Sequence, residues 1–555
     1  MVVRSINSQL RNVEKKPSAK RWTEQDKIFA LSLYKRSPKL YRYLSVYFQV
    51  PSTRTLKTIL SNIPLDTGIN KPLLDHLKNV CQTMNKLDKC CSLIFDEISL
   101  SSGFFYEASK DMAFGYEDLG HLGRTSRHAN HALVFMLRGM RKTWKQVVAY
   151  YLTSATISVA NLKNIITLII NQALEAGFNV MATVCDQGST NRAALNELCW
   201  ENSSRFQFKV NGHDIACIFD VPHLLKNTRN ALYTCDFIFD GDKRAKFEHI
   251  VQLYEIDKHK EIPSLYKLKD EHFNINDSYM KMRVNIAAWM LSNTVGAGLE
   301  TYAETNGQGL LPPEAKNTAI FVRNMDQLFD SLNGYTLNPD AGKTYRTVLR
   351  DNSPHWELWD RLLTQIKNWK LIRKSDGRDH TNQFQFINGW MVTIQSVKKL
   401  WLRLKQMGIS YLNLRNLNQD PLENLFCLIR QHGMSNNNPN CHQFVAALKT
   451  TVLNRMFLSG VRGANCEDDR CESLDNFAVF LNGEHTKQET IESSSSDQLE
   501  FVFNAEALTP EDSQGLAYVS GYILKKINLP DVNCETCKKQ LYANKKNQFQ
   551  TEDFE

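Results

Sequence analysis

Leu93-Ile94-Phe95-Asp96-Glu97-Ile98-Ser99-Leu100 is the stretch of the chain that decides the fold. Its five apolar positions predict a buried strand, yet two adjacent carboxylates stand at its centre. Burying a carboxylate is costly unless a cation or hydrogen-bond donors compensate. Because neighbouring residues of a strand point to opposite faces, Asp96 and Glu97 cannot share one task. Two interpretations are open: an edge strand with two solvated acids, or a strand that presents one acid to a site.

The segments after this strand alternate between strand-like and helix-like patterns. Short apolar runs bounded by turn residues predict strands, and apolar residues at helical spacing predict helices. We predict strands at 103–107, 131–137, 180–186 and 215–219, and helices at 157–176, at 191–199 and from Asp220 onward. With 93–100 as the first strand, this order is that of an α/β RNase H-like core, in which the first and fourth strands are neighbours.

Asp186 ends the fourth predicted strand, so this topology brings it beside Asp96. Two carboxylates a few ångström apart repel each other unless a divalent cation neutralises them. Hard oxygen ligands favour Mg²⁺ or Mn²⁺, and two such ions can hold the attacking and leaving oxygens of a phosphoryl transfer. Asp220 is an alternative second acid because it also ends a strand. His223 has two interpretations, a metal-adjacent acid/base or phosphate contact, and a packed histidine that opens a helix.

A third acid follows much later, in Asn418-Gln419-Asp420-Pro421-Leu422-Glu423-Asn424-Leu425-Phe426. Pro421 suits the first position of a helix, and Asp420 suits the N-cap. Glu423 then lies one turn into the helix, on a different face from the apolar stripe. Taken alone, Glu423 is also explained as an acid that stabilises the helix N-terminus through the dipole.

The amino-terminal part of the chain is strongly basic. Residues 1–62 hold 13 Lys and Arg against 3 Asp and Glu, whereas the whole chain has a net charge of +8. We predict a basic flexible arm at 1–20 and three short helices at 21–62, arranged as a helix-turn-helix whose Thr53, Arg54 and Lys57 face DNA. A small helical bundle that binds proteins is the alternative.

Composition excludes some classes of protein. The longest apolar run falls short of the roughly 18 residues that span a bilayer, so we expect no membrane segment. The amino terminus lacks the apolar stretch of a secretory signal, and 13 scattered cysteines suit a reducing compartment. Together with the basic arm, these features favour a nuclear protein.

Spaced blocks of this sequence resemble the signature blocks of P-element-type transposases. The resemblance runs from about residue 21 to about residue 526, and its blocks occur in the family's order. They are Phe95-Asp96-Glu97-Ile98, Cys185-Asp186-Gln187-Gly188-Ser189, Phe219-Asp220-Val221-Pro222-His223-Leu224-Leu225-Lys226-Asn227, Asp420-Pro421-Leu422-Glu423-Asn424-Leu425-Phe426 and Ile429-Arg430-Gln431-His432-Gly433 with Asn438-Pro439. The resemblance implies a DNA transposase that cleaves a strand and transfers its 3′-OH, with Asp96, Asp186 and Glu423 as catalytic metal ligands.

The resemblance also accounts for the long interval before Glu423. The family carries a GTP-binding insertion there, which implies a mostly helical GTP domain at 233–415. Its spacing maps GTP contacts onto Asp330, Asn333 and Asp420, with GTP as a structural ligand. Ala341-Gly342-Lys343-Thr344 matches only the end of a P-loop and is treated as a chance match.

These inferences divide the chain into seven parts. They are a basic flexible arm at 1–20, the helix-turn-helix at 21–62, a linker helix at 63–90, the first part of the core at 91–232, the insertion at 233–415, the second part of the core at 416–465, and a carboxyl-terminal region at 466–555 with a disordered Ser/Glu-rich loop. Within the last part, Cys534 and Cys537 have half of a zinc-ligand spacing that Cys466 and Cys471 could complete.

One departure from the family pattern keeps a second function open. Family members usually begin with a zinc-binding THAP module and a coiled-coil dimerisation helix, and residues 1–20 contain no Cys or His. A truncated copy, an incomplete gene model and a protein that uses only the helix-turn-helix all fit. The alternative to an active transposase is therefore a domesticated or truncated non-catalytic DNA-binding protein. A nuclear scaffold without DNA is a third reading, and homo-oligomerisation is expected from the family.

Overall fold

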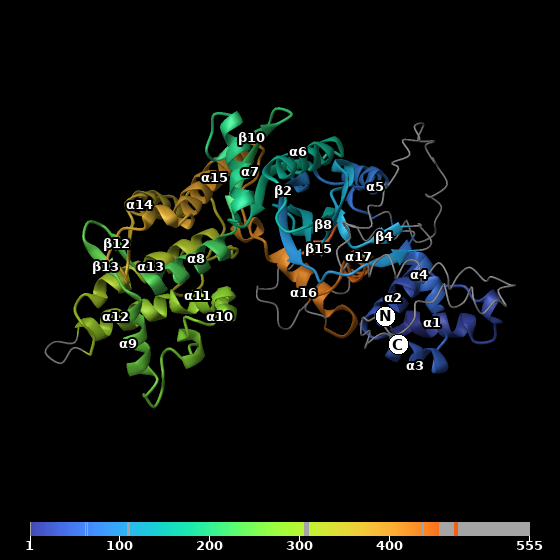
Figure 1. Cartoon of the computed structure of the whole chain (residues 1–555), viewed down its shortest axis with the longest axis horizontal. Helices are drawn as coiled ribbons and strands as arrows, with labels where there is room; N and C mark the ends of the chain where they lie inside the picture. Colours follow the sequence, from blue (N-terminus) through green and yellow to red (C-terminus); the bar gives the residue numbers. More distant parts are fainter. Residues whose placement is uncertain are drawn as a thin grey trace, which may run out of the picture. The chain divides into compact units, whose positions relative to one another are not determined.

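A mixed β-sheet is built around the strand that carries Asp96, as the computed structural model shows (Figure 1). The structure describes residues 2–61, 63, 65–107, 112–304, 310–435, 438–453 and 471–474. The strand order is β10-β11-β9-β2-β7-β8-β5-β6, with β1 and β15 also paired to β8. Its strands are β1 (Gly68–Ile69), β2 (Cys90–Ser99), β5 (Tyr116–Asp118), β6 (Arg124–His128), β7 (His131–Gly139), β8 (Trp144–Thr153), β9 (Asn179–Cys185), β10 (Gln207–Val210), β11 (His213–Phe219) and β15 (Glu472–Ser473).

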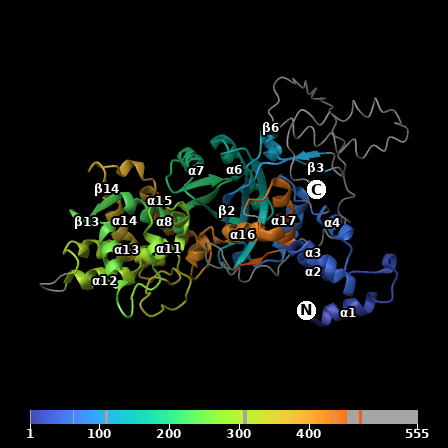
Figure 2. The ribbon, with the colours of Figure 1, turned by 60° about the horizontal axis from the view of Figure 1, so that its bottom comes forward.

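The predicted neighbour relation between the first and fourth core strands is confirmed. β2 pairs with β9 in parallel and with β7 antiparallel, and β9 pairs in parallel with β11. Helices α6 (Val159–Glu175), α7 (Ser189–Glu201), α15 (Phe386–Gln406) and α16 (Asp420–Ser435) contact its strands, and the other helices of the core segments are α5 (Lys71–Gln82), α8 (Val221–Thr234) and α17 (Cys441–Leu453). Figures 1 and 2 place α6 and α16 on opposite sides of β2. The fold is the RNase H-like α/β core expected from the sequence.

Two strand predictions were wrong. The segment 103–107 is not the second strand of the core: β3 (Phe105–Glu107) pairs with β4 (Met112–Phe114) in a separate two-stranded sheet. The core instead uses β7 and then β8, which the prediction missed although all ten residues of β8 are buried. The aromatic residues of 104–106 favour a strand locally, but tertiary pairing decides to which sheet a strand belongs.

The insertion is mostly helical, as predicted, and also contains a small antiparallel sheet of order β13-β12-β14. Arg283 interrupts the helical stretch that runs from Ser278 to Met290 and separates α10 from α11. The elements of the insertion are β12 (Cys235–Phe239), β13 (Lys243–Ala245), α9 (Phe247–Asp257), η4 (Asp270–Phe273), α10 (Ser278–Met282), α11 (Val284–Met290), α12 (Asn293–Glu304), α13 (Ala315–Leu332), α14 (His355–Lys367), β14 (Lys370–Arg373), η5 (Thr381–Gln383), α15 (Phe386–Gln406) and η6 (Leu414–Leu417).

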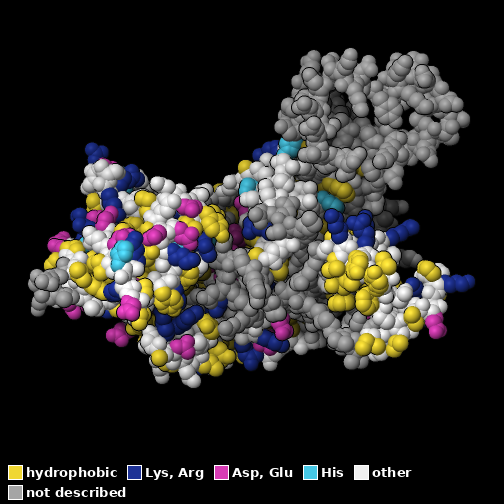
Figure 3. Space-filling model, turned by 90° about the horizontal axis from the view of Figure 1, so that it is seen from below, with side chains coloured by type: hydrophobic (Ala, Val, Ile, Leu, Met, Phe, Trp, Pro, Cys, Tyr) yellow, Lys and Arg dark blue, Asp and Glu magenta, His cyan; other side chains and the backbone are white. Residues whose placement is uncertain are grey.

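Three helices form the predicted helix-turn-helix segment: α2 (Glu24–Arg36), α3 (Pro38–Tyr47) and α4 (Thr53–Ser61). Thr23 and Asp26 form a capping box at the start of α2. The predicted flexible arm instead contains helix α1 (Val2–Asn12), because Gln9 exchanges two hydrogen bonds with the backbone of Gln49. Figure 3 shows hydrophobic side chains gathered over these helices; the exposed ones on α3 are Leu40, Tyr43, Val46 and Tyr47.

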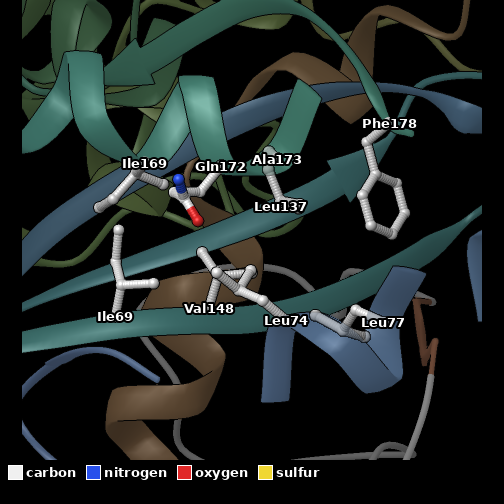
Figure 4. Close-up of a pocket in the computed structure, with 9 residues that line it drawn as sticks. All are labelled: Ile69, Leu74, Leu77, Leu137, Val148, Ile169, Gln172, Ala173 and Phe178. Carbon is white, nitrogen blue, oxygen red and sulfur yellow. The ribbon is translucent and has the colours of Figure 1, made fainter. Parts of the chain in front are cut away.

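The linker region also differs from the single helix expected at 63–90. It contributes strand β1 to the edge of the sheet before α5 begins, and η2 (Lys86–Lys89) leads directly into β2. None of the helices in the described residues is long and apolar enough to cross a bilayer. A cavity of about 10 Å³ lies between α5, α6 and the sheet, lined by apolar side chains and Gln172 (Figure 4). We interpret it as a packing gap rather than a ligand site.

Candidate active site

Asp96 and Asp186 are brought together by the register of two parallel strands. Ile94 pairs with Val184, and each aspartate lies two residues beyond its member of that pair. Both side chains therefore emerge on the same side of the sheet at the ends of the strands. Burial and then the charge of Asp186 raise the pKa of Asp96 to about 8, although His223 and a hydrogen bond from the Glu97 N–H oppose this. Such repulsion between carboxylates is what a divalent cation would relieve.

The turn after β9 holds the Asp186 carboxylate in place. The Gly188 N–H and the Asn191 side chain donate to its Oδ1 at 2.9 and 2.7 Å. A Cβ on residue 188 would lie 3.1 Å from this oxygen, so glycine permits the close approach. Both of these bonds use Oδ1, which leaves Oδ2 to face a cation.

Glu97 lies next to Asp96 and shares its electrostatic surroundings. Burial and then the charge of Asp186 raise the pKa of Glu97 to about 7. Its backbone N–H donates to Asp96 Oδ1 at 2.8 Å. We predicted that only one acid of this pair contacts the site directly. Glu97 is not part of the predicted triad, but its carboxyl group adds negative charge beside it.

Glu423 completes the predicted triad from α16, a helix that also contacts β2. Its Oε1 lies 3.3 Å from His223 Nε2 on α8, and its charge raises the pKa of Asp96 further. The carbonyl of Gln419 accepts from the Glu423 N–H, so Gln419 rather than Asp420 is the N-cap. The three acids predicted from distant segments thus converge on one electrostatically coupled site.

Asp220 and Gln419 anchor α16 to the sheet. Asp220 Oδ1 accepts from the Gln419 N–H at 2.8 Å, and its Oδ2 accepts from the His223 N–H at 2.9 Å. The Gln419 side chain donates to the carbonyl of Phe95, next to Asp96. Asp220 is only 1% exposed and both of its carboxylate oxygens accept hydrogen bonds, so it caps α8 and links that helix to the segment before α16. Sequence reasoning missed Gln419 because the groups that tie it to the core, on Asp220 and Phe95, are distant in the chain.

Two basic groups offset the negative charge. Burial lowers the pKa of His223, but its hydrogen bond to Glu423 and the charge of Asp220 outweigh burial and raise the pKa to about 9. His223 is therefore protonated at neutral pH and forms an ion pair with Glu423. Lys226, one turn further along α8, lies near the same acids; burial lowers its pKa and the carboxylates partly restore it. In the sequence, Lys226 was marked only by its place in the block at 219–227 that resembles the transposase family.

A metal would have to be held by the carboxylates. Within the part of the chain that the structure describes, no group of three or more His, Cys, Asp or Glu side chains is already arranged as a metal cluster. The donor set nevertheless fits a hard divalent cation, because hard oxygen ligands are what Mg²⁺ and Mn²⁺ prefer. The first ligands available to such a cation are Asp186 Oδ2 and the carboxylate of Asp96, whose charged form is disfavoured by burial and by Asp186.

The residues predicted to contact GTP lie where the end of α13 meets the segment before α16. Asn418 donates to Asn333 Oδ1 at 3.2 Å and to Asp420 Oδ2 at 2.9 Å, so these two predicted residues share one partner. Asp330, one turn before Asn333, forms an ion pair with Lys343 at 2.8 Å. Burial and then the charge of Asp220 raise the pKa of Asp420 to about 8. Lys343, dismissed above as part of a chance match, is thus a structural partner of Asp330.

The residues predicted to contact DNA lie on α4. Arg54 and Lys57 are exposed and Thr53 is partly exposed. Their exposure is compatible with contacts to DNA but does not test that prediction. The predicted disordered loop and Cys466, Cys534 and Cys537 lie outside the described residues, whereas Cys471 is described and buried.

Three family models match the chain and together cover more than half of it. They are the TNP-like RNase H N-terminal domain at residues 65–199, the TNP-like GTP-binding insertion domain at residues 222–344, and the TNP-like RNase H C-terminal domain at residues 416–449. Each match falls on the corresponding part of the structure, and the first begins ahead of β1 rather than at residue 91.

Two curated proteins and one solved structure are similar to the chain. The Transposable element P transposase of Drosophila melanogaster is 23% identical over 90% of this chain and 64% of its own length. Human DNA transposase THAP9 is 23% identical over 94% of this chain and 60% of its own length. The chain therefore spans less than two thirds of either relative. A chain of the Drosophila P element transposase strand transfer complex has a similar fold, with a TM-score of 0.68, 22% identity, and coverage of 82% of this chain and 98% of that chain.

Proposed function

Because the chain belongs to the P-element-type transposase family, we propose that it is a DNA transposase that cleaves a DNA strand and joins the freed 3′-OH to target DNA. The observation that carries this proposal is the parallel pairing of β2 with β9, which sets Asp96 beside Asp186 within the field of Glu423. Two steps are proposed, a hydrolysis and a transesterification. In the first, a water oxygen attacks phosphorus and the bond to the 3′-oxygen breaks, with a proton passing to that oxygen. In the second, the freed 3′-OH loses its proton and attacks a target phosphorus, the bond from that phosphorus to the target's 3′-oxygen breaks, and a proton passes to the oxygen that leaves.

In this proposal Asp96, Asp186 and Glu423 would hold Mg²⁺ or Mn²⁺. A divalent ion bound there would lower the pKa of attacking water and offset charge on the phosphate. The chain's own contribution is positioning: His223 holds Glu423 by an ion pair, and Asp220 and Gln419 fasten the start of α16 to the strand that carries Asp96. The half-buried ammonium of Lys226 moderates the repulsion among the acids.

We further propose that the insertion binds GTP as a structural ligand through Asp330, Asn333 and Asp420. The match to the GTP-binding insertion domain model supports this part of the proposal. A carboxylate can accept hydrogen bonds from the guanine N1–H and N2–H, a pattern that adenine does not offer. Guanine selectivity is therefore the property to measure.

The partners and location follow from the same proposal. Arg54 and Lys57, exposed on α4 in the basic amino-terminal segment, would bind phosphate groups, and transposon ends and target DNA would be the ligands. Joining two ends requires more than one active site, so a homo-oligomer is proposed. Action on chromosomal DNA places the proposed activity in the nucleus.

The test is strand nicking and joining with labelled duplexes. Pre-nicked substrates with a 3′-OH and Mn²⁺ would lower the demand for recognition of a particular DNA sequence. We compare the wild type with Asp96→Ala, Asp186→Ala and Glu423→Ala, and use Asp360→Asn on the exposed face of α14 as a matched control.

Loss of activity in all three variants, with the control active, would support the proposal. Activity that survives Asp186→Ala but not Asp220→Asn would mean that the second acid is misassigned. A wild-type protein without activity that still binds DNA with steep salt dependence would favour the domesticated DNA-binding alternative.

A further inference from the structure

An exposed tryptophan lies at the end of α7, away from the three acids of the candidate active site. Trp200 is 84% exposed, although large aromatic side chains normally bury most of their surface. It lines an open groove of about 620 Å³ between the end of α7, the segment before β10 and α15. The lining residues are Trp200, Ser203, Ser204, Arg205, Phe206 and Lys399.

The groove combines aromatic rings with positive charge. Lys399 Nζ lies 5.2 Å from the centre of the Phe206 ring, a cation–π distance. Among the described residues, neither Arg205 nor Lys399 takes part in an ion pair, and none of the six lining residues is acidic. The nearby acid Glu201 is already paired with Lys163. The field in the groove is therefore positive.

The groove is also rigid before any ligand arrives. Ser203 and Ser204 donate backbone hydrogen bonds to the last turn of α7, to Trp200 and Cys199. The Phe206 carbonyl accepts from the Cys217 N–H of β11 and from the Ser396 hydroxyl of α15. A ligand that binds here need not order the loop, which preserves binding free energy.

We propose that this groove binds single-stranded DNA, with a base stacked on Trp200 and phosphates on Arg205 and Lys399. Proteins that hold single strands combine such stacking platforms with a basic groove, and every base offers a face for stacking. In a duplex the bases are stacked on each other and cannot reach the indole. An acidic peptide could use the two cations but has no comparable use for an isolated indole face.

The position of the groove suits a strand that leaves the active site. α7 begins directly after the turn of Asp186, and Trp200 lies eleven residues along it, about 17 Å at about 1.5 Å per residue. That span corresponds to about five nucleotides at the B-form spacing of about 3.4 Å. The inference goes beyond the proposed function, because holding a strand requires none of the three acids.

The experiment titrates the full chain, in EDTA, with a twelve-nucleotide oligothymidylate. The signal is the tryptophan fluorescence of the wild type minus that of Trp200→Phe, which isolates Trp200 from the other tryptophans and from other DNA-binding surfaces. We expect this difference signal to be quenched on saturation, and Trp200→Ala to weaken binding of the same oligonucleotide, labelled with fluorescein and followed by its anisotropy, about tenfold or more. The double variant Arg205→Gln/Lys399→Gln should lower the salt slope by about 1.4, since each phosphate contact on a single strand contributes about 0.7.

Controls separate the groove from the rest of the protein. Tyr266→Ala removes an equally exposed aromatic from the insertion and should change neither affinity nor salt slope. Because the assay contains no divalent cation, a protein that fails to join DNA strands still gives an answer. An unchanged Trp200 signal on saturation, or equal affinity in Trp200→Ala, would overturn the proposal. So would stronger quenching by an oligoglutamate peptide than by the oligonucleotide, which would assign the groove to a protein partner.

Discussion

Removal of the charge at Asp96 should stabilise the metal-free protein at neutral pH. The pKa of Asp96 rises from 3.8 to about 8 on folding, chiefly through burial and the charge of Asp186. The folded state therefore binds this proton more tightly than the unfolded state. Its contribution to stability is complete below about pH 4 and is lost as the pH rises to about 8.

The magnitude follows from the shift. pH 7 lies about three units above the pKa of Asp96 in the unfolded state, and each unit is worth about 1.4 kcal/mol of stability. The upper limit of the loss at pH 7 is therefore about 4 kcal/mol. Asp96 retains partial contact with solvent, which screens the charge, so we expect about half of this, about 2 kcal/mol. Asp96→Asn replaces the carboxylate by a neutral group of the same shape and should recover that amount at pH 7.

The assay is thermal unfolding in EDTA at pH 4, 7 and 8. Asp96→Asn should melt about 4–8 °C above the wild type at pH 7 and no higher at pH 4. Mg²⁺ should stabilise the wild type more than the variant, because it relieves a repulsion that the variant no longer has. Asp360→Asn, an exposed acid, is the control and should change little. A variant no more stable than the wild type at pH 7 would refute the argument that Asp96 and Asp186 repel each other in the folded protein.

Three further changes test other contacts. His223→Ala removes the partner of Glu423 and should slow strand joining about 10–100-fold with unchanged DNA affinity, measured by single-turnover kinetics and filter binding; an equal loss of affinity would contradict a positioning role. Lys343→Met leaves Asp326 and Asp330 without their cation and should lower the free energy of unfolding by about 3 kcal/mol in urea, whereas Lys343→Arg should retain most of it. Gly334→Ala places a Cβ 2.2 Å from the Thr347 carbonyl oxygen, so the backbone beside Asn333 must move; we expect at least tenfold weaker binding of a fluorescent GTP analogue, while Gly103→Ala, whose Cβ would meet nothing closer than 3.8 Å, should bind normally.

The wrong assignment of segment 103–107 to the core sheet shows what local sequence patterns cannot predict. The segment 103–107 has strand propensity and forms a strand, but among the described residues this strand pairs with β4 and not with the core sheet. β8 has an equally clear strand pattern and fills the place assigned to 103–107, because β7 offers it a matching edge. Propensity predicts that a strand forms, and only pairing across the chain decides which sheet includes it.

The insertion was implied by the resemblance to the family, whereas the residue pattern by itself determined the strand of Asp96, the strand end at Asp186 and the helix of Glu423. These follow from periodicity, turn residues and helix-start signals, which act over a few residues. Only the tertiary structure decided that Asp220 ties α16 to the sheet, that His223 pairs with Glu423, that Lys343 neutralises Asp330 and that Trp200 stays exposed. Each of these depends on groups far apart in the chain that meet across packed elements, where burial makes their charges and hydrogen bonds strong enough to matter.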